Sequence, residues 1–281
     1  MKNLGYYNGK IGSIEQMMVP MTDRAFYFGD GVYDAVMCRN NIPYLLCEHI
    51  ERFYNNCLRL GINSPLSQEA LCELIFELVK KVDANEKFVY FHASRGCALR
   101  AHSAMPENGN ICIMITPLEI GDISMKMRAI LTPDNRYGLC DIKTLNLLPS
   151  VLAAQQAEGF NADEAIFCRN GIITEGSHCN VSIIKGGKII TAPKSCHILP
   201  GVTRAHLIDE AREMGIIVEE REYGVDELKN ADEILITSSS KLLRGVKELD
   251  GERVGGKAPE LLSLLQKRLL SHYLDATKPI S

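Results

Sequence analysis

The sequence predicts a protein of mixed helices and strands, an α/β or α+β chain folded as two domains. Its 281 residues exceed the usual size of one domain and can form ample apolar core. Short apolar runs of strand character alternate with longer segments of helical periodicity. A Pro and a Gly interrupt this alternation within residues 117–122. We therefore expect a smaller N-terminal domain in residues 1–118, a linker in residues 119–123 and a larger C-terminal domain in residues 124–281.

Two helices followed by two strands are predicted for the N-terminal domain. Residues 48–60 place their apolar side chains on one helical face, and Gly61 is positioned to end that helix. Ser67 is a suitable N-cap for a second helix that runs to about residue 82. The apolar runs that follow predict strands at residues 88–94 and 111–116.

Strands outnumber helices in the prediction for the C-terminal domain. Asn170-Gly171 is a strong signal for a tight hairpin, and Gly186-Gly187 predicts a second turn of the same kind. Strands are expected at residues 127–131, 165–168, 172–174, 188–191, 216–218 and 234–237. Helices are expected up to Gly159, from about Thr203 to Gly215, and over residues 258–274.

Charge and hydropathy exclude several classes of partner. The formal net charge is -4, and the charged residues are mixed along the chain, so no basic stripe for nucleic acid or for a membrane surface is expected. The N-terminal residues lack the apolar core of a signal peptide, and no later run reaches the length of a membrane span. We expect a cytoplasmic protein with a small-molecule partner.

The 10 cysteines contain no CxxC pair, and most lie inside apolar segments. This pattern favours buried free thiols over disulfides or a metal cage. No metal site is expected.

Lys143 is the most informative single residue, because it stands among apolar neighbours in the run Asp141-Ile142-Lys143-Thr144-Leu145. Such surroundings disfavour the charged amine, lower its pKa and make the lysine a usable nucleophile toward a carbonyl. A second polar cluster, with Glu175 and Ser177, follows where a predicted strand leaves its sheet. A lysine that forms a Schiff base and an acid that holds a pyridinium nitrogen are what pyridoxal phosphate chemistry needs.

A phosphate group would require hydrogen-bond donors, and two segments offer them. Gly201-Val202-Thr203 begins a predicted helix, and helix N-termini bind anions. Ser238-Ser239-Ser240 follows a predicted strand and adds hydroxyl groups. Taken separately, Thr203 is more simply a helix cap and the serines a loop. Only together with Lys143 do the two segments favour a phosphate site.

Three further positions have both a functional and a structural interpretation. Arg52 lies off the apolar stripe of its helix, so it is either a solvated charge or a donor that reaches inward to an anion. Arg100 and His102 stand two residues apart in an irregular segment; they are either exposed loop residues or a pair that binds a carboxylate. Tyr33 follows two glycines that permit close approach of a ligand, although an isolated tyrosine is more often a core residue.

Five separated segments together resemble the fold-type IV family of pyridoxal phosphate enzymes, nearly from end to end of the chain. Within that family the D-amino-acid aminotransferases are the most similar group, because of the stretch from Lys143 to Leu148 and the Arg100-x-His102 pair. His178-Cys179 stands where that group commonly has two serines. The five segments are Phe28-Gly29-Asp30-Gly31-Val32-Tyr33, Glu48-His49-Ile50-Glu51-Arg52, Ile142-Lys143-Thr144-Leu145-Asn146, Thr174-Glu175-Gly176-Ser177 and Gly201-Val202-Thr203-Arg204.

This resemblance implies a fold and a role for each candidate residue. The implied fold is two α/β domains with the cofactor between them, completed as a homodimer. Lys143, in the larger domain, would bond covalently with pyridoxal 5'-phosphate and move the substrate proton, and Glu175 would pair with the pyridine nitrogen. The remaining cofactor contacts would come from Arg52, Ser177, Leu199, Val202, Thr203 and Ser239. The substrate carboxylate would be bound by Tyr33, Arg100 and His102.

The implied reaction is transamination between a D-amino acid such as D-alanine and a 2-oxo acid such as 2-oxoglutarate. Two alternatives use the same lysine and acid: an aminodeoxychorismate lyase, which releases 4-aminobenzoate and pyruvate, and a branched-chain aminotransferase. A different class of protein, a regulatory module that binds a nucleotide or sugar phosphate without chemistry, would have an ordinary lysine at position 143.

Overall fold

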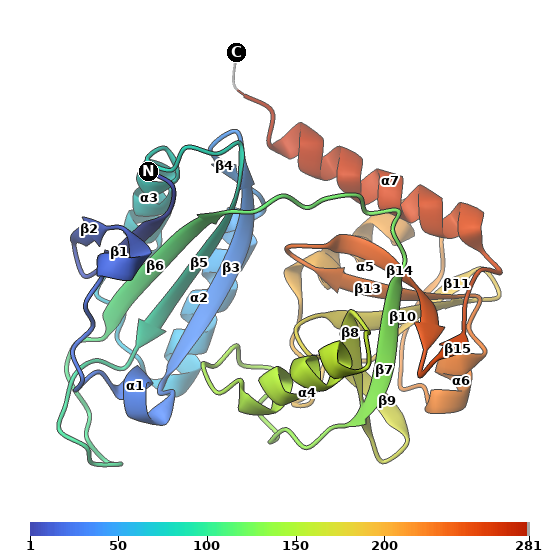
Figure 1. Ribbon diagram of the computed structural model, residues 1–281, viewed down its shortest axis with the longest axis horizontal. Helices are drawn as coiled ribbons and strands as arrows, with labels where there is room; N and C mark the ends of the chain where they lie inside the picture. The colour runs from blue at the N-terminus through green and yellow to red at the C-terminus, as the bar shows by residue number, and fades with distance from the viewer. Residues whose placement is uncertain (280–281) are drawn as a thin grey trace. The chain divides into compact units, whose positions relative to one another are not determined.

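The computed structural model describes residues 1–279, and its contacts divide the chain into two units (Figure 1). Unit 1 comprises Met1–Glu119, the short segment Ile142–Asn146 and the C-terminal residues from Leu274. Unit 2 comprises Ile120–Asp141 and Leu147–Tyr273. The short segment differs from the expected division, because its contacts place Lys143 with the N-terminal residues rather than with residues 124–281.

Unit 1 is an antiparallel sheet with two helices on one face (Figure 1). The strand order is β2-β1-β6-β5-β3-β4. Apolar side chains of α2 and α3 pack with those of the sheet into one buried core. The strands are β1 Leu4–Tyr7, β2 Lys10–Gly12, β3 Gly31–Arg39, β4 Ile42–Pro43, β5 Glu86–Ser94 and β6 Asn110–Pro117, and the helices are η1 Ile14–Gln16, α1 Arg24–Phe28, α2 Leu46–Leu60 and α3 Gln68–Val79.

Local signals positioned these helices well. Helix α2 ends at Gly61, which has a φ of 61° and so adopts the left-handed conformation that glycine accommodates without strain. Helix α3 begins after Ser67, whose side chain accepts a hydrogen bond from the backbone N–H of Ala70. Both predicted helices are therefore confirmed, although α3 ends three residues before residue 82, at Val79.

Unit 2 is built on a nine-stranded mixed sheet. Its strands run in the order β12-β11-β10-β13-β14-β7-β8-β9, and β15 pairs with β14. The strands are β7 Met127–Pro133, β8 Glu164–Arg169, β9 Ile172–Gly176, β10 Asn180–Lys185, β11 Lys188–Thr191, β12 Val218–Glu220, β13 Glu233–Ser238, β14 Leu242–Leu249 and β15 Glu252–Arg253. The helices are α4 Leu148–Gly159, α5 Val202–Glu213, α6 Val225–Lys229 and α7 Pro259–Ala276.

Both faces of the unit 2 sheet are buried, which explains its long apolar runs. Ile184 and Leu235 pack under α5 and α7 on one face. Their neighbours Ile183 and Ile234 belong to a second core on the other face, together with Leu228 of α6. Successive residues of a strand point to opposite faces, so consecutive isoleucines fill both cores.

The sequence located most elements of unit 2 and missed others. The hairpin at Asn170-Gly171 is confirmed, with φ of 52° and 84°. The strand expected at residues 216–218 lies two residues later, at Val218–Glu220, and β14 was not foreseen because Gly245 interrupts its pattern. In unit 1, β1 and β3 were not assigned in advance.

All ten cysteines are free thiols, as expected. Their burial was overestimated: three are buried, whereas Cys47, Cys97 and Cys196 are exposed. Among the described residues, none of the helices is both apolar enough and long enough to span a bilayer.

Candidate active site

Lys143 is held beside the start of β3 by backbone hydrogen bonds. The N–H of Tyr33 donates to the Lys143 carbonyl at 2.9 Å, and the N–H of Leu145 donates to the Gly31 carbonyl at 3.0 Å. Gly31 is required for this close approach, since a Cβ there would lie 2.6 Å from Leu145 Cδ1. The Lys143 Nζ lies 4.3 Å from the centroid of the Tyr33 ring, within the range of a cation–π contact.

Tyr33 belongs to a row of ring side chains on neighbouring strands. Its ring stacks on Tyr90 of β5 with centroids 5.4 Å apart, and His92 follows at 5.7 Å from Tyr90. Burial lowers the pKa of His92 to about 4. The His92 Nδ1 is buried without a hydrogen-bond partner in the described part of the chain. These half-buried rings lie in a row that begins next to the lysine.

Arg52 points inward and binds Asp34 of β3. Its Nε and Nη2 donate to the two carboxylate oxygens at 2.9 and 2.7 Å, and His49 Nδ1 lies 2.7 Å from Oδ1. Burial raises the pKa of Asp34, but the charges of Arg52 and His49 outweigh it, so this pKa lies well below its ordinary value. Desolvation lowers the pKa of His49. The carboxylate therefore fixes the guanidinium in one orientation.

Arg100 and His102 meet on the ring of Phe28. The Arg100 guanidinium carbon lies 5.1 Å from the ring centroid, and the His102 ring centroid lies 4.9 Å from it. Arg24 holds this segment by donating to the carbonyls of Ala101 and His102 at 2.7 and 3.2 Å. Both side chains are exposed, and Phe28 is a neighbour of each.

Glu175, in unit 2, stands near the end of β9 with 5% of its surface exposed. Arg136 donates to one carboxylate oxygen. The other oxygen accepts from the side-chain amide of Asn180 at 3.1 Å and from the backbone N–H of Leu199 at 2.9 Å. Such donors favour an ionised carboxylate and fix its direction.

Arg136 is itself held by a second carboxylate. Its Nε and Nη2 donate to the oxygens of Asp134 at 2.9 and 3.0 Å, and its guanidinium lies 4.3 Å from the ring centroid of Phe167. Burial opposes ionisation of Asp134, yet hydrogen bonds from Arg136 and Thr174 lower its pKa to about 2. The guanidinium thus joins two carboxylates.

The start of α5 lies against Asn180. Val202 and Thr203 form the first turn of this helix, and Thr203 is 6% exposed. Gly201 precedes them, and a Cβ there would meet the Asn180 side-chain oxygen at 2.0 Å. The carbonyl of Leu199 accepts a hydrogen bond from the Asn180 amide at 2.9 Å. One asparagine therefore connects the helix start to Glu175.

Hydroxyl groups collect at the end of β13. Ser239 follows this strand in a turn and is half-buried. The hydroxyls of Thr237 and Ser238 are buried and make no hydrogen bond within residues 1–279. Buried polar groups are seldom left without partners in folded proteins, so these two are candidates for binding a ligand.

Ser177 lies in a separate polar cluster around Glu164. Its hydroxyl donates to Glu164 and lies 2.8 Å from His178 Nδ1. Lys241 approaches the other Glu164 oxygen at 3.3 Å, as does the thiol of Cys179. His178 and Cys179, which stand where the related group commonly has two serines, thus lie in the cluster around the buried Glu164. Any ligand contact of Ser177 would lie next to this cluster.

Several supporting residues were missed by the sequence analysis. His49 lies within a segment that was quoted for another reason, and Asp34 directly follows one. Asp34 lies on the unassigned strand β3, and His49 of α2 contacts it. Arg136 follows a predicted strand as a polar residue, which is a weak signal alone. Glu164 reads as a strand residue before an apolar run. Each of the four has at least one partner distant in sequence, which periodicity does not report.

Comparison with known proteins identifies the family. The model of amino-transferase class IV matches residues 31–249. The chain is 34% identical over 273 residues to the D-alanine aminotransferase of Bacillus licheniformis, covering 94% of this chain and 96% of that protein. It is 36% identical over 267 residues to the D-alanine aminotransferase of Staphylococcus aureus (strain COL), covering 93% and 95%. The protein belongs to the class IV aminotransferases.

A solved structure supports the fold. The branched-chain aminotransferase of the thermophilic archaeon Thermoproteus uzoniensis, determined with norvaline, has a TM-score of 0.87 to this chain at 22% identity. The match covers 98% of this chain and 94% of that structure. The fold-type IV architecture and the aminotransferase class expected from the resemblance are therefore confirmed.

Proposed function

We propose that this protein transfers the amino group between a D-amino acid, D-alanine first, and a 2-oxo acid such as 2-oxoglutarate, with pyridoxal phosphate as cofactor. The observation that carries the proposal is the identity of 34% to a D-alanine aminotransferase over 94% of the chain. The pair formed by Arg100 and His102 supports it, because two exposed cationic or polar groups on one ring suit a carboxylate.

The residues present fit this cofactor. Unpartnered buried hydroxyls at Thr237 and Ser238 are donors that a phosphate would satisfy. The start of α5 adds the backbone N–H groups of Val202 and Thr203, which no residue of the helix itself can accept from. In the proposal, these groups and Ser239 bind the phosphate together with Arg52, with Leu199 and Ser177 alongside.

When bound, pyridoxal phosphate supplies an electron sink that makes the α-proton of an amino acid acidic. The Lys143 Nζ, in the proposal, takes this proton and returns it, and the Tyr33 ring 4.3 Å away restricts access of water on one side. The fixed carboxylate of Glu175 keeps a proton on the pyridine nitrogen. Tyr33, Arg100 and His102 bind and orient the substrate carboxylate.

One observation favours a second candidate, a branched-chain aminotransferase. The structural neighbour from Thermoproteus uzoniensis has that activity by name. At 22% identity, however, this likeness supports only a shared fold. The higher identity to D-alanine aminotransferases makes the D-specific reaction the better proposal.

A substrate panel tests the reaction. Purified protein is mixed with single D- and L-amino acids, and the absorbance of the bound cofactor is followed without a second substrate. D-alanine should convert the cofactor, and 2-oxoglutarate should restore it. Turnover of L-valine or L-leucine alone, with no D-amino acid accepted, would refute the proposal in favour of the branched-chain activity.

The lysine assignment has its own experiment. The protein as isolated should be yellow, because the lysine-bound cofactor absorbs violet light, and borohydride reduction followed by peptide mass analysis should place the cofactor on Lys143. Lys143→Ala should lose both signals. Lys188→Ala is the control, since Lys188 lies on β11 and pairs only with a surface glutamate, Glu219, at 2.9 Å. Retention of the reduced cofactor in Lys143→Ala would remove this lysine from the mechanism.

We further propose a cytoplasmic homodimer. Ten free thiols, three of them exposed, suit a reducing compartment. Large apolar side chains are exposed near the segment of Arg100, including Leu99 at 84% and Phe26 at 70%. Exposed apolar clusters of this kind are typical of protein interfaces. Sedimentation at micromolar concentration tests the dimer, which a purely monomeric profile would contradict.

A further inference from the structure

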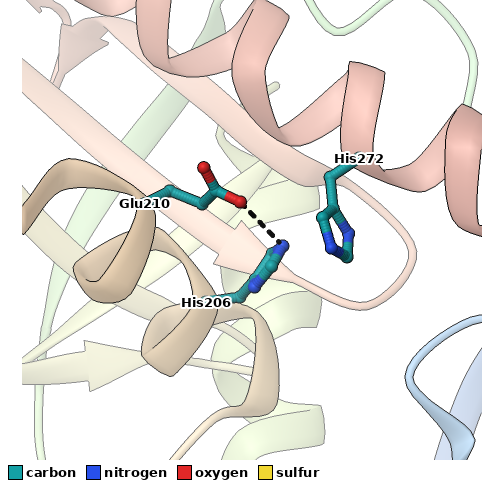
Figure 2. A group of neighbouring side chains, drawn as sticks. All are labelled: His206, Glu210 and His272. Carbon is teal, nitrogen blue, oxygen red and sulfur yellow. Dashed lines mark ion pairs between the residues drawn. The ribbon is translucent and has the colours of Figure 1, made fainter. Parts of the chain in front are cut away.

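A cluster of two histidines and a glutamate lies between two helices of unit 2 (Figure 2), and none of its three residues is assigned to the reaction. His206 and Glu210 are four residues apart on α5, so they lie on the same face of the helix. His272 comes from α7, and its ring faces His206. Both helices pack on the same face of the sheet, through Leu207 and Leu265 among others, so the cluster rests on a rigid base.

We propose that His206, Glu210 and His272 bind a divalent transition-metal ion, Zn²⁺ in the first instance. The potential ligand atoms of the three side chains all lie within 4.8 Å of one another. His206 Nε2 lies 3.7 Å from a Glu210 oxygen, and the two imidazole centroids are 4.2 Å apart. Ligand atoms about 2.0–2.2 Å from a tetrahedral Zn²⁺ are about 3.3 Å from each other, so small side-chain rotations complete the site.

The ligand set decides which ion is bound. Two imidazole nitrogens and one carboxylate oxygen suit Zn²⁺, Co²⁺ or Ni²⁺. Ca²⁺ and Mg²⁺ prefer shells made of oxygen, which this cluster does not provide. The His206 side chain remains 17% exposed, so solvent reaches the cluster from one side. Three protein ligands and one water molecule then form the coordination shell.

Charges around the cluster favour a cation. Arg268 donates to the Glu210 oxygen on the far side from His206 and to Glu213 at 3.1 Å. One arginine is therefore shared by two carboxylates, which leaves an excess of negative charge beside the imidazoles. A carboxylate held in this way by an outer partner keeps its other oxygen directed at the ion.

A bound ion would connect α5 with α7 through coordination bonds. Helix α5 begins with Val202 and Thr203, and α7 is the last helix of the chain. The ion would then act as a structural link between elements far apart in sequence. The alternative for the same side chains is an ion pair of His206 with Glu210 against which His272 merely packs, and it predicts no metal affinity.

The test uses the untagged, full-length protein with its cofactor bound, dialysed against a chelator and then against metal-free buffer. Calorimetric titration with Zn²⁺ should show one ion per chain, and Co²⁺ should give visible ligand-field bands. The melting temperature should rise with Zn²⁺ concentration. His272→Gln should weaken Zn²⁺ binding by more than the roughly 10–100-fold loss that follows removal of an outer-shell partner.

Controls separate this site from adventitious binding and from misfolding. His197→Gln removes a histidine of unit 2 outside the cluster and should leave Zn²⁺ binding unchanged. His206→Gln serves as a second ligand variant if His272→Gln alters the circular dichroism spectrum. Absence of stoichiometric binding, or binding equal in all variants, overturns the proposal. The outcome is independent of the aminotransferase proposal, because the readouts are affinity, colour and melting temperature.

Discussion

Two buried carboxylates, Asp34 in unit 1 and Glu175 in unit 2, each bind an arginine. The two pairs differ in which partner has the proposed functional role. Asp34 is fully buried, binds Arg52 through both oxygens and has His49 as a further partner. Glu175 accepts hydrogen bonds from Arg136, from the side-chain amide of Asn180 and from the backbone N–H of Leu199. In unit 1 the acid positions a cation for the proposed phosphate contact, whereas in unit 2 the cation positions the acid. In each unit, the residue with the proposed functional role is thus held in place by a residue of opposite charge that has no proposed contact with the cofactor.

Replacement of the acting acid should have the largest effect. Glu175→Gln keeps the size of the side chain but removes the charge that would hold a proton on the cofactor. We expect kcat to fall by roughly 100–1,000-fold, as for loss of a preorganised electrostatic group. Steady-state kinetics with D-alanine measures this change. The fold should survive, since Arg136 keeps its two bonds to Asp134.

Glu175→Asp is the matched control, because it keeps the charge and shifts its position. It should recover part of the lost kcat. If Glu175→Gln retained the activity of the parent, the acid would have no role in the reaction and the comparison would reduce to two structural ion pairs.

Replacement of Arg136 and of Arg52 compares how much each arginine contributes to the unfolding free energy. Arg136→Met leaves Asp134 with Arg169 and Thr174, and Glu175 with the amide donors of Asn180 and Leu199. Loss of one partner of a buried pair costs about 3–5 kcal/mol of unfolding free energy. Arg52→Met removes the guanidinium from Asp34, which retains His49, so we expect a loss of about 1–3 kcal/mol. Urea denaturation followed by circular dichroism gives both values. Equal losses of unfolding free energy in the two variants would show that Asp134, the second carboxylate of unit 2, does not depend on Arg136.

The sequence analysis proposed a functional role for Glu175 and for Arg52 but did not foresee the residues that support them. Lys143, Glu175, Arg52 and the first turn of α5 stand in short segments that local pattern and family resemblance both indicate. The supports, such as Asp34 and Arg136, become recognisable only when strands distant in sequence are paired. β3 escaped notice because both of its faces are largely buried, so the alternation typical of a half-exposed strand is absent.

The sequence analysis also did not predict that the segment Ile142–Asn146 belongs to unit 1. Lys143 follows residues of unit 2 along the chain but pairs with β3 through backbone groups. Backbone hydrogen bonds cannot be recognised from residue types. A single boundary at residues 119–123 therefore could not predict that the Lys143 segment pairs with β3.

Acid should weaken unit 1 before unit 2. The pKa of His92 falls from 6.5 to about 4 in the folded state, so the unfolded state binds a proton that the folded state refuses. Its contribution is present above pH 6.5 and is lost as the pH falls from 6.5 toward 4. The pKa of Asp134 in unit 2 is lowered from 3.8 to about 2, so its contribution is lost only as the pH falls from about 3.8 toward 2.

Hydrogen exchange measured by mass spectrometry, after incubation at several pH values and labelling at one, resolves the two units. Peptides of β5 should lose protection near pH 5 while peptides of β8 keep theirs. His92→Phe should remove this difference because it has no proton to bind. Loss of protection in both units at the same pH, or an unchanged profile in His92→Phe, would contradict the assignment.

The smallest expected effect concerns the hydroxyl of Thr237, which in contrast to the polar groups around Asp34 has no partner among residues 1–279. Thr237→Val removes an unsatisfied buried group, so the cofactor-free protein should gain up to about 1 kcal/mol of unfolding free energy. If Thr237 donates to the phosphate, the same change should raise the dissociation constant of the cofactor by at most about tenfold. Thr191→Val is the control, because Thr191 accepts from Arg204 at 3.2 Å and its loss should destabilise the protein. A gain in stability together with weaker cofactor binding would show that this hydroxyl is kept for the ligand, and a gain with unchanged binding would assign it no ligand at all.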